Sequence, residues 1–230
     1  MEKPTLFKTY PLAEVFHSIQ GEGTWMGLPM TFVRFAGCSV GRYHFGTEQP
    51  ATCQAYAGEF QCDTDYRAKF RWTALQIVDA VKPERTMCIT GGEPLDHDIT
   101  EIVQLAHAMN LRVHLETSGT VWRDCLREID HVACSPKKHV LPQVLQVAHE
   151  LRFLWEPKWK QRPDQLLADI DDLVLFAMGA RFTQPPRVYL SPVNYYDKPN
   201  KENLEQVMEV LRLRPTWLLS PQLHKYLHVR

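Results

Sequence analysis

Residues 85–116, RTMCITGGEPLDHDITEIVQLAHAMNLRVHLE, decide the fold. The apolar run at 85–90 is typical of a buried strand, and the run at 111–116 repeats it. Between them, hydrophobic residues recur at helical spacing over 99–109. This order predicts a βα unit whose two strands pair in parallel through a right-handed crossover.

The same alternation continues on both sides of this unit. Nearly all of the expected strands are separated by helices, which predicts a parallel α/β sheet. We expect one domain over 1–230, folded as a partial TIM-like (βα) barrel of about six to seven strands. The further strands are expected at 31–35, 131–135, 151–156, 187–190 and 217–220, and the further helices at 123–129, 141–150, 165–178 and 202–212.

Composition and charge limit the classes of function. With 44% hydrophobic and 23% charged residues, the chain is typical of a globular protein. A formal net charge of −1 gives no field that would attract a nucleic acid or an anionic membrane. The N-terminus lacks the apolar core of a secretory signal, and no apolar run approaches the roughly 18 residues of a membrane span. These features predict a cytoplasmic protein with a small-molecule ligand and no nucleic-acid or membrane partner.

Polar segments follow five of the expected strands. Parallel strands end at one rim, which carries the active site in such folds, so these segments are expected to meet there. Each of these segments alone is common where a strand leads into a helix, but five of them at equivalent positions favour a binding site. The segments are T90-G-G-E-P, E116-T-S-G, S135-P-K-K, S191-P-V and S220-P-Q-L-H-K.

Three of the six cysteines, Cys38, Cys53 and Cys62, lie in an irregular stretch at 37–71. In a reducing compartment, metal binding explains such a cluster better than disulfides do. The stretch is polar, so burial would not account for its cysteines. Three thiolates suit a [4Fe–4S] cluster with one free iron, or a structural zinc with a fourth ligand from elsewhere. Candidates for that fourth ligand are Cys88, Cys134 and a histidine such as His44.

Seven motifs together resemble the 7-carboxy-7-deazaguanine synthases, a family of radical S-adenosylmethionine (SAM) enzymes. GGEP alone is shared among several radical enzymes, whereas IQGEG before the cysteines, CDT after them and a terminal QxHK are more specific. The resemblance covers about residues 10–230. The motifs are F16-H-S-I-Q-G-E-G, R34-F-A-G-C, C62-D-T, T90-G-G-E-P, E116-T-S-G, S135-P-K and Q222-L-H-K-Y.

The cysteine spacing departs from the usual radical SAM pattern. That pattern is C-x3-C-x2-C, whereas this chain has C-x14-C-x8-C. Lengthening two flexible loops to this extent costs only about 1 kcal/mol each by the logarithmic closure term. Metal–thiolate binding is worth on the order of 10 kcal/mol, so the spacing is compatible with a cluster.

The resemblance implies an activity and a set of partners. The enzyme would be a carbon–nitrogen lyase that converts 6-carboxy-5,6,7,8-tetrahydropterin to 7-carboxy-7-deazaguanine with loss of ammonia, in queuosine-type 7-deazapurine biosynthesis. Its cofactors would be a [4Fe–4S] cluster, SAM and Mg²⁺. The cluster and SAM generate the radical, so no catalytic side chain is expected. A flavodoxin-like or similar external electron donor and a homodimeric state are also implied.

The resemblance also implies residues for the cofactors. Cys38, Cys53 and Cys62 would ligate the cluster, and Thr64 would be the one protein ligand of Mg²⁺ unless it is only a helix cap. Two glycines would let the backbone approach the methionyl group, and the following glutamate would accept from its ammonium. The expected SAM contacts are Gln61, Asp63, Gly91, Gly92, Glu93, Ser118, Ser135, Pro136, Lys137 and Ser191.

For the substrate, the resemblance implies a cation and several hydrogen-bonding groups. Arg34, four residues before Cys38, would grip the carboxylate bidentately. His224 would contact the substrate from the C-terminal segment, unless it is a surface histidine. The other expected substrate contacts are Ile19, Gln20, Gly21, Glu22 and Thr90.

Two alternatives remain at this level. A glycyl-radical activating enzyme also carries three cysteines and GGEP, but IQGEG and the terminal QxHK argue against it. A non-catalytic, zinc-binding interaction protein would use the same cysteines. A visible iron–sulfur spectrum after anaerobic reconstitution separates that second alternative from an enzyme.

Overall fold

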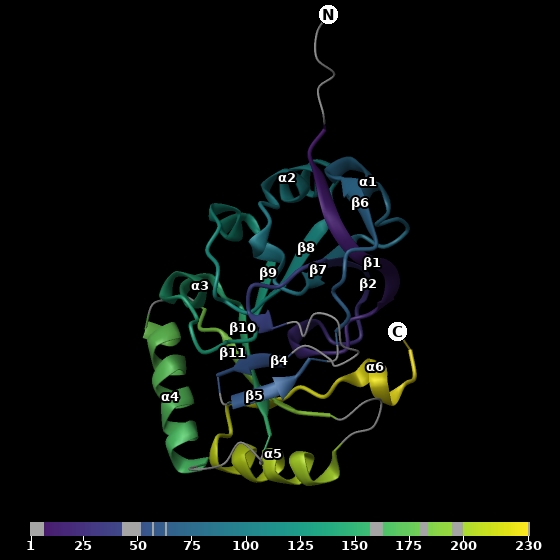
Figure 1. Cartoon of the computed structure of the whole chain (residues 1–230). Coiled ribbons are helices and arrows are strands. Elements are labelled where there is room, and N and C mark those ends of the chain that lie inside the picture. Colours follow the sequence, from purple (N-terminus) through teal and green to yellow (C-terminus); the bar gives the residue numbers. More distant parts are fainter. Residues whose placement is uncertain are drawn as a thin grey trace, which may run out of the picture.

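The computed structural model of the chain describes residues 7–42, 52–56, 58–62, 64–156, 163–179, 184–194 and 200–229. A curved nine-stranded sheet forms the centre of the molecule, with helices arranged around it (Figure 1). Two residues named from the sequence, Asp63 and His44, lie outside the described residues.

Seven adjacent strands of the sheet are parallel, in the order β12-β11-β10-β9-β8-β7-β2. All seven coincide with strands expected from the sequence, so the predicted parallel sheet is confirmed. They are β2 (Pro29–Phe35), β7 (Thr86–Gly91), β8 (Arg112–Thr117), β9 (His131–Cys134), β10 (Glu150–Trp155), β11 (Arg187–Pro192) and β12 (Leu218–Leu219).

Two further strands extend the sheet beyond β2. β1 (Thr9–Ile19) pairs with β2, and β6 (Phe70–Thr73) pairs with β1, both antiparallel. The stretch 37–71 is also less irregular than expected, because it contains a second, three-stranded antiparallel sheet. This sheet consists of β3 (Gly41–Arg42), β4 (Thr52–Ala55) and β5 (Gly58–Gln61).

The helices follow the strands as the sequence alternation predicts, with two differences. The expected helix at 123–129 is a 3-10 turn, and a short helix after β6 was not expected; Thr73 begins that helix with a capping box to Gln76. No described helix is long and apolar enough to cross a membrane. The helices are α1 (Ala74–Asp79), α2 (Thr100–Ala108), α3 (Pro142–Val147), α4 (Pro163–Gly179), α5 (Lys201–Leu213) and α6 (Leu223–Tyr226), with 3-10 turns η1 (Gly23–Trp25), η2 (Pro94–Asp96) and η3 (Asp124–Glu128).

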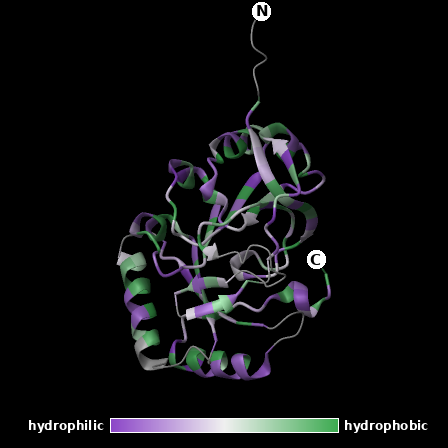
Figure 2. Cartoon of the chain, viewed as in Figure 1, coloured by the Kyte–Doolittle hydropathy of each residue, from purple (hydrophilic) through white to green (hydrophobic). Residues whose placement is uncertain are grey.

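Alternation along the parallel strands separates an apolar face from a polar one. On β7 and β8, Met87, Ile89, Val113 and Leu115 belong to the main hydrophobic core, together with inward residues of α1 to α5. α4 and α5 alternate between hydrophobic and hydrophilic residues, as such packing requires (Figure 2). The neighbouring strand positions face the other way and carry polar groups, among them Thr90, Glu116 and Arg152.

The segment after β12 joins the two sides of the curved sheet. Ser220 accepts a hydrogen bond at its Oγ from the backbone N of Gly23 (3.0 Å), and Leu223 N donates to Gly21 O (2.9 Å). These bonds connect the last parallel strand with the loop after β1. The sheet is therefore a partial barrel whose concave, polar face is partly enclosed by α6.

Candidate active site

A cavity of about 650 Å³ lies on the polar face, at the carboxyl ends of the parallel strands. All five polar rim segments contribute to it, which confirms their predicted convergence. Of the residues expected from the sequence, those that line it are Ile19, Gln20, Gly21, Glu22, Arg34, Cys38, Cys53, Gln61, Cys62, Thr64, Thr90, Gly91, Gly92, Ser118, Ser135, Lys137, Ser191 and His224. Glu93 and Pro136 are buried behind its wall.

The three loop cysteines meet at this cavity. Cys38 follows β2, Cys53 lies on β4, and Cys62 follows β5. Cys53 is buried, contrary to the expectation of a polar loop without burial, because β4 pairs on both sides within its small sheet. Burial raises the pKa of the Cys53 thiol to about 11, against the opposing charge of Lys137, while Cys62 and Cys38 raise it further. The three thiols are therefore close enough to interact.

The spacing of these sulfurs bears on the kind of metal group they suit. A single zinc ion with bonds of about 2.3 Å holds its sulfurs roughly 3.8 Å apart. In the described parts of the chain, the group whose ligand atoms all lie within 4.8 Å of one another is Cys88, His114 and Glu116, and it includes none of the loop cysteines. The sulfurs of the three loop cysteines are therefore not all within 4.8 Å of one another, so a single ion would require them to move closer.

The GGEP segment packs against the first cysteine. A Cβ added at Gly92 would lie 1.8 Å from Gly37 O and 2.6 Å from the Cys38 Cβ. Only a glycine therefore allows β7 to end this close to the Cys38 loop. This close approach is to the cysteine loop, which the sequence did not indicate.

Glu93 is fully buried beneath the cavity wall. Its carboxylate accepts hydrogen bonds from Leu95 N (3.1 Å), Thr117 Oγ1 (2.9 Å) and both Ser118 N (2.8 Å) and Ser118 Oγ. Burial raises the pKa of this carboxyl against these hydrogen bonds. Glu93 thus ties the rim segment of β7 to that of β8 and stands behind the cavity lining.

Two polar groups of the lining have few partners of their own. Lys137 is buried, and its Nζ donates to Ser135 O and Ser135 Oγ, both at 2.9 Å and both uncharged. The Ser191 Oγ is buried and has no hydrogen-bond partner within the described residues. A buried ammonium and an unsatisfied hydroxyl at a cavity wall are positions where a polar, anionic ligand is stabilised.

The cavity floor is built around Arg152 on β10, which is almost fully buried. Its Nη1 donates to Glu22 (2.6 Å), its Nη2 to Glu116 (2.9 Å), and its Nε lies 3.2 Å from Glu150. Burial would raise the pKa of the Glu116 carboxyl, but the charge of Arg152, with help from His114 and Thr90, lowers it to about 2. Three carboxylates surround one guanidinium, so the floor carries excess negative charge.

Neighbouring side chains extend this network. Glu116 also accepts from Thr90 Oγ1 (2.7 Å) and from Gln20 Nε2 (3.2 Å). Glu150 accepts from Thr24 N (2.7 Å), and it fills the space where a Cβ on Gly23 would lie, at 2.0 Å. At the side of the cavity, Arg34 donates from Nε to Glu14 (2.7 Å). The QGEG motif is therefore held in place by the strand-borne carboxylates.

Position bears on the alternatives for two single residues. Thr64 is no helix cap, because no helix begins there and the next element is β6; its neighbour Asp65 binds Arg67 (2.9 Å). His224 is half-buried and lines the cavity, and its Nδ1 stands 2.0 Å from the point where a Gly21 Cβ would be; a substrate contact from it stays a prediction.

The sequence reasoning missed several cavity residues. Arg152 lies in the strand expected at 151–156 and was given no role, although a charged residue in an apolar run is a signal in itself. Glu150, its ion-pair partner, was placed at the end of the helix expected at 141–150, whereas it begins β10. Glu116 was quoted in a motif without a role. Tyr66 and Lys225 also line the cavity.

A partial parallel barrel whose cavity, at the carboxyl ends of the strands, is lined by three cysteines is the architecture of a radical SAM enzyme. The fold is similar to the crystal structure of QueE from Escherichia coli, with a TM-score of 0.69 and 24% identity over 94% of this chain and 95% of that one. No family model matches the chain.

Curated proteins give the family. A 7-carboxy-7-deazaguanine synthase from Synechocystis sp. is 31% identical over 226 residues, covering 96% of this chain and 94% of the relative. The synthases of Flavobacterium psychrophilum and Escherichia coli K12 are 29% and 28% identical; they cover 95% and 96% of this chain and are themselves covered over 92% and 99%. The chain belongs to the 7-carboxy-7-deazaguanine synthase family.

Proposed function

We propose that this chain is a radical SAM lyase that converts 6-carboxy-5,6,7,8-tetrahydropterin to 7-carboxy-7-deazaguanine with loss of ammonia. The observation that carries the proposal is the convergence of Cys38, Cys53 and Cys62 with five polar rim segments on one cavity. This occurs in a chain that matches synthases of that name over nearly its whole length.

The cofactor side of the cavity is the rim near the cysteines. When bound there, a [4Fe–4S] cluster and SAM supply a carbon-centred radical that removes hydrogen from the substrate. Lys137 suits the carboxylate of SAM, because its ammonium now has only uncharged oxygens as hydrogen-bond partners among the described residues. Ser191, whose hydroxyl is unsatisfied, and Ser135 suit the ribose hydroxyls. Gln61, Gly91 and Gly92 complete this contact surface.

Glu93 and Ser118 act together in this proposal. Ser118 lines the cavity and bonds through N and Oγ to the carboxylate of Glu93 behind it. Glu93 therefore orients Ser118 and holds two rim segments at a fixed separation. A direct contact from Glu93 to the ammonium of SAM would require this buried carboxylate to exchange one of its present partners.

The substrate side is the floor and the wall formed by β2. Arg34 donates from Nε to Glu14, so its terminal nitrogens can form a bidentate pair with the substrate carboxylate. The donor-rich pyrimidine edge of a pterin matches the excess negative charge of Glu22 and Glu116. Gln20, Thr90 and the backbone at 19–21 can complete this recognition, and His224 covers the same side.

Three finer features rest on the family resemblance. Thr64 lines the cavity next to Cys62 and can offer one hydroxyl to a magnesium ion that keeps water or substrate oxygens as its other ligands. An external electron donor of the flavodoxin type would reduce the cluster. The protein would act as a homodimer.

Anaerobic reconstitution tests the function directly. The iron-loaded protein, incubated with SAM, a reductant and the pterin, should form 7-carboxy-7-deazaguanine and ammonia, which mass spectrometry and an ammonia assay detect. A colourless protein that holds one zinc and forms no product would support the zinc-binding alternative. Cleavage of SAM that depends on a second protein, with the pterin left intact, would support a glycyl-radical activating enzyme.

A further inference from the structure

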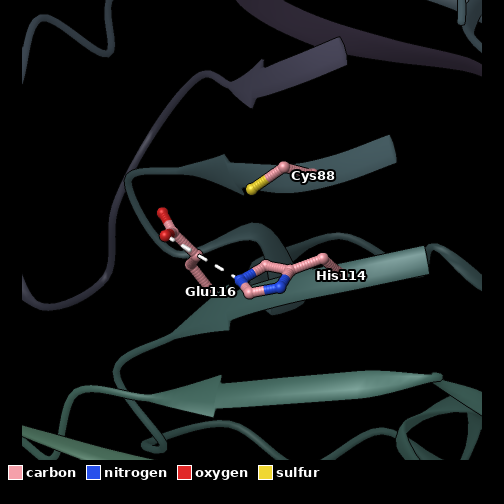
Figure 3. Close-up of side chains that lie close together, drawn as sticks. All are labelled: Cys88, His114 and Glu116. Atoms are coloured by element: carbon pink, nitrogen blue, oxygen red, sulfur yellow. Dashed lines mark ion pairs between the residues drawn. The ribbon is translucent and has the colours of Figure 1, made fainter. Parts of the chain in front are cut away.

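A second group of potential metal ligands lies directly below the cavity floor. Cys88 precedes Thr90 by two residues on β7, and His114 precedes Glu116 by two on β8, so each pair faces the same side of its strand. Cys88 and His114 are direct partners in the parallel ladder. Figure 3 shows the sulfur of Cys88, the ring of His114 and the carboxylate of Glu116 turned toward one another.

The donor atoms of this group converge. One ligand atom from each of the three residues lies within 4.8 Å of the others, and His114 Nε2 is 4.0 Å from Glu116 Oε1. The amide nitrogen of Gln20 stands between them, 3.3 Å from His114 Nε2 and 3.2 Å from Glu116 Oε1. An amide nitrogen only donates, so lone pairs of both groups point at its position. That position is one where a cation would be stabilised.

Charge and burial favour a cation there. Cys88 and His114 are fully buried, and the adjacent floor holds Glu116, Glu22 and Glu150 against one arginine. Burial lowers the pKa of His114 to about 3, so its imidazole is neutral and keeps a lone pair. Burial raises the pKa of Cys88, so a metal ion must displace the thiol proton on binding.

We propose that Cys88, His114 and Glu116 form a binding site for one divalent transition-metal ion of the zinc type. A thiolate and an imidazole select zinc-like ions over magnesium or calcium. The ligand atoms need to approach by roughly 1 Å to reach the tetrahedral spacing of bonds of about 2.0–2.3 Å. Glu116 and Gln20 line the cavity, so the ion would enter from it by displacing the Gln20 amide. This site is separate from the cysteine cavity mouth and from Thr64.

Occupancy of this site changes the cavity floor. Glu116 would then bind the metal ion in addition to Arg152 and Thr90. Gln20 would lose the two acceptors that it has now. If Glu116 and Gln20 bind the pterin, which rests on the proposed function, then zinc and substrate compete. Zinc binding itself does not depend on that function.

Zinc content and zinc spectroscopy test the site on the iron-loaded protein. The protein is given one equivalent of ZnCl₂ anaerobically, desalted and analysed for zinc and by X-ray absorption at the zinc edge, to which iron does not contribute. We expect about one zinc per chain, with one sulfur at about 2.3 Å and the remaining ligands at about 2.0–2.1 Å. Failure to retain zinc, or a spectrum with two or more sulfurs, overturns the proposal.

Variants locate the ion. Cys88→Ser and His114→Leu should each weaken zinc binding at least ten-fold, whereas Cys134→Ser, at a buried cysteine on the neighbouring strand β9, should bind zinc as the wild type does. Equal losses in all three variants, or no loss in the first two, contradict the site. The sulfur count of the wild type decides the question if a variant fails to fold. Normal product formation without zinc retention overturns this site alone and leaves the proposed function intact.

Discussion

The cysteine side of the cavity and its floor are built in opposite ways. The cysteines come from a turn, a four-residue strand and the end of a small antiparallel sheet. The floor comes mainly from the parallel strands β8 and β10, and short ion pairs to Arg152 fix its charges in place. A cluster supplies its own geometry once its thiolates can reach it, whereas substrate recognition needs groups fixed in advance. This difference explains how the chain can have a C-x14-C-x8-C spacing and still present an ordered floor.

The largest effect on stability is expected at the floor. Arg152→Met leaves three carboxylates facing one another without their shared cation, which typically costs about 3–5 kcal/mol. Urea unfolding of the iron-free protein measures this cost. The control is Arg214→Met, whose pair with Asp171 is about one-third exposed and should contribute at most about 1 kcal/mol. Equal losses in the free energy of unfolding for the two variants would show that the ion pairs of the floor contribute no more stability than a pair at the surface.

Substitutions of Arg34 test whether the substrate side and the cofactor side of the cavity bind different ligands. Arg34→Ala should weaken pterin binding roughly hundred-fold and leave SAM binding unchanged, because a partly buried bidentate partner is lost. Arg34→Lys should restore only part of the loss, since lysine lacks the planar fork. Calorimetry with each ligand measures both, and Arg71→Ala on β6 is the control. Equal weakening of both ligands, or a fully active lysine variant, contradicts the assignment.

The contribution of the floor to stability should also depend on pH, because of Glu150. Burial would raise the pKa of this carboxyl, but the hydrogen bond with His131, the charge of Arg152 and the bonds from Thr24 lower it to about 2. A carboxyl with a lowered pKa contributes stability above its unfolded value of about 4.3, and this contribution is lost as the pH falls toward 2. The free energy of unfolding should therefore fall more steeply over that range in the wild type than in Glu150→Gln. Parallel pH profiles would contradict this.

The smallest effect is expected on the cysteine side, at Thr64. Thr64→Ala should raise the magnesium concentration needed for half-maximal turnover several-fold, because the one protein ligand of the ion is removed. The iron–sulfur spectrum and uncoupled cleavage of SAM should not change. Thr9→Ala, at the start of β1, is the control. An unchanged magnesium response in Thr64→Ala would show that Thr64 does not bind the ion.

The parallel part of the fold could be predicted from the sequence because its signals are local. The seven strands are mainly apolar runs, five of them are followed by polar or Ser-Pro segments, and most of the helices between them keep a 3.6-residue spacing. β1 and β6 gave no such signal, since an antiparallel edge carries mixed polar and apolar residues. The small sheet in the cysteine stretch was missed because its strands have two to four residues.

The candidate site also has one part that local sequence signals predict and another part that they do not. The rim motifs were found because each stands directly after a strand, and the cavity brings them together. The network of Arg152 could not be found, because its partners Glu22 and Glu116 lie 130 and 36 residues away. Only the curvature of the sheet makes them neighbours. Similarly, no local pattern indicated that Glu93 is enclosed by Thr117 and Ser118 behind the cavity wall.

The central claim is that three cysteines with this unusual spacing hold one iron–sulfur cluster at the mouth of the cavity. The most direct measurement is the iron and sulfide content, with the visible spectrum, of the reconstituted wild type and of the Cys38→Ala, Cys53→Ala and Cys62→Ala variants. The account predicts four irons and four sulfides in the wild type, with loss of cluster absorbance and of deoxyadenosine production in each variant. Cys125→Ala should keep the full cluster. A Cys53→Ala protein that retains both the cluster and deoxyadenosine production would contradict the claim, because another residue would then be the third ligand.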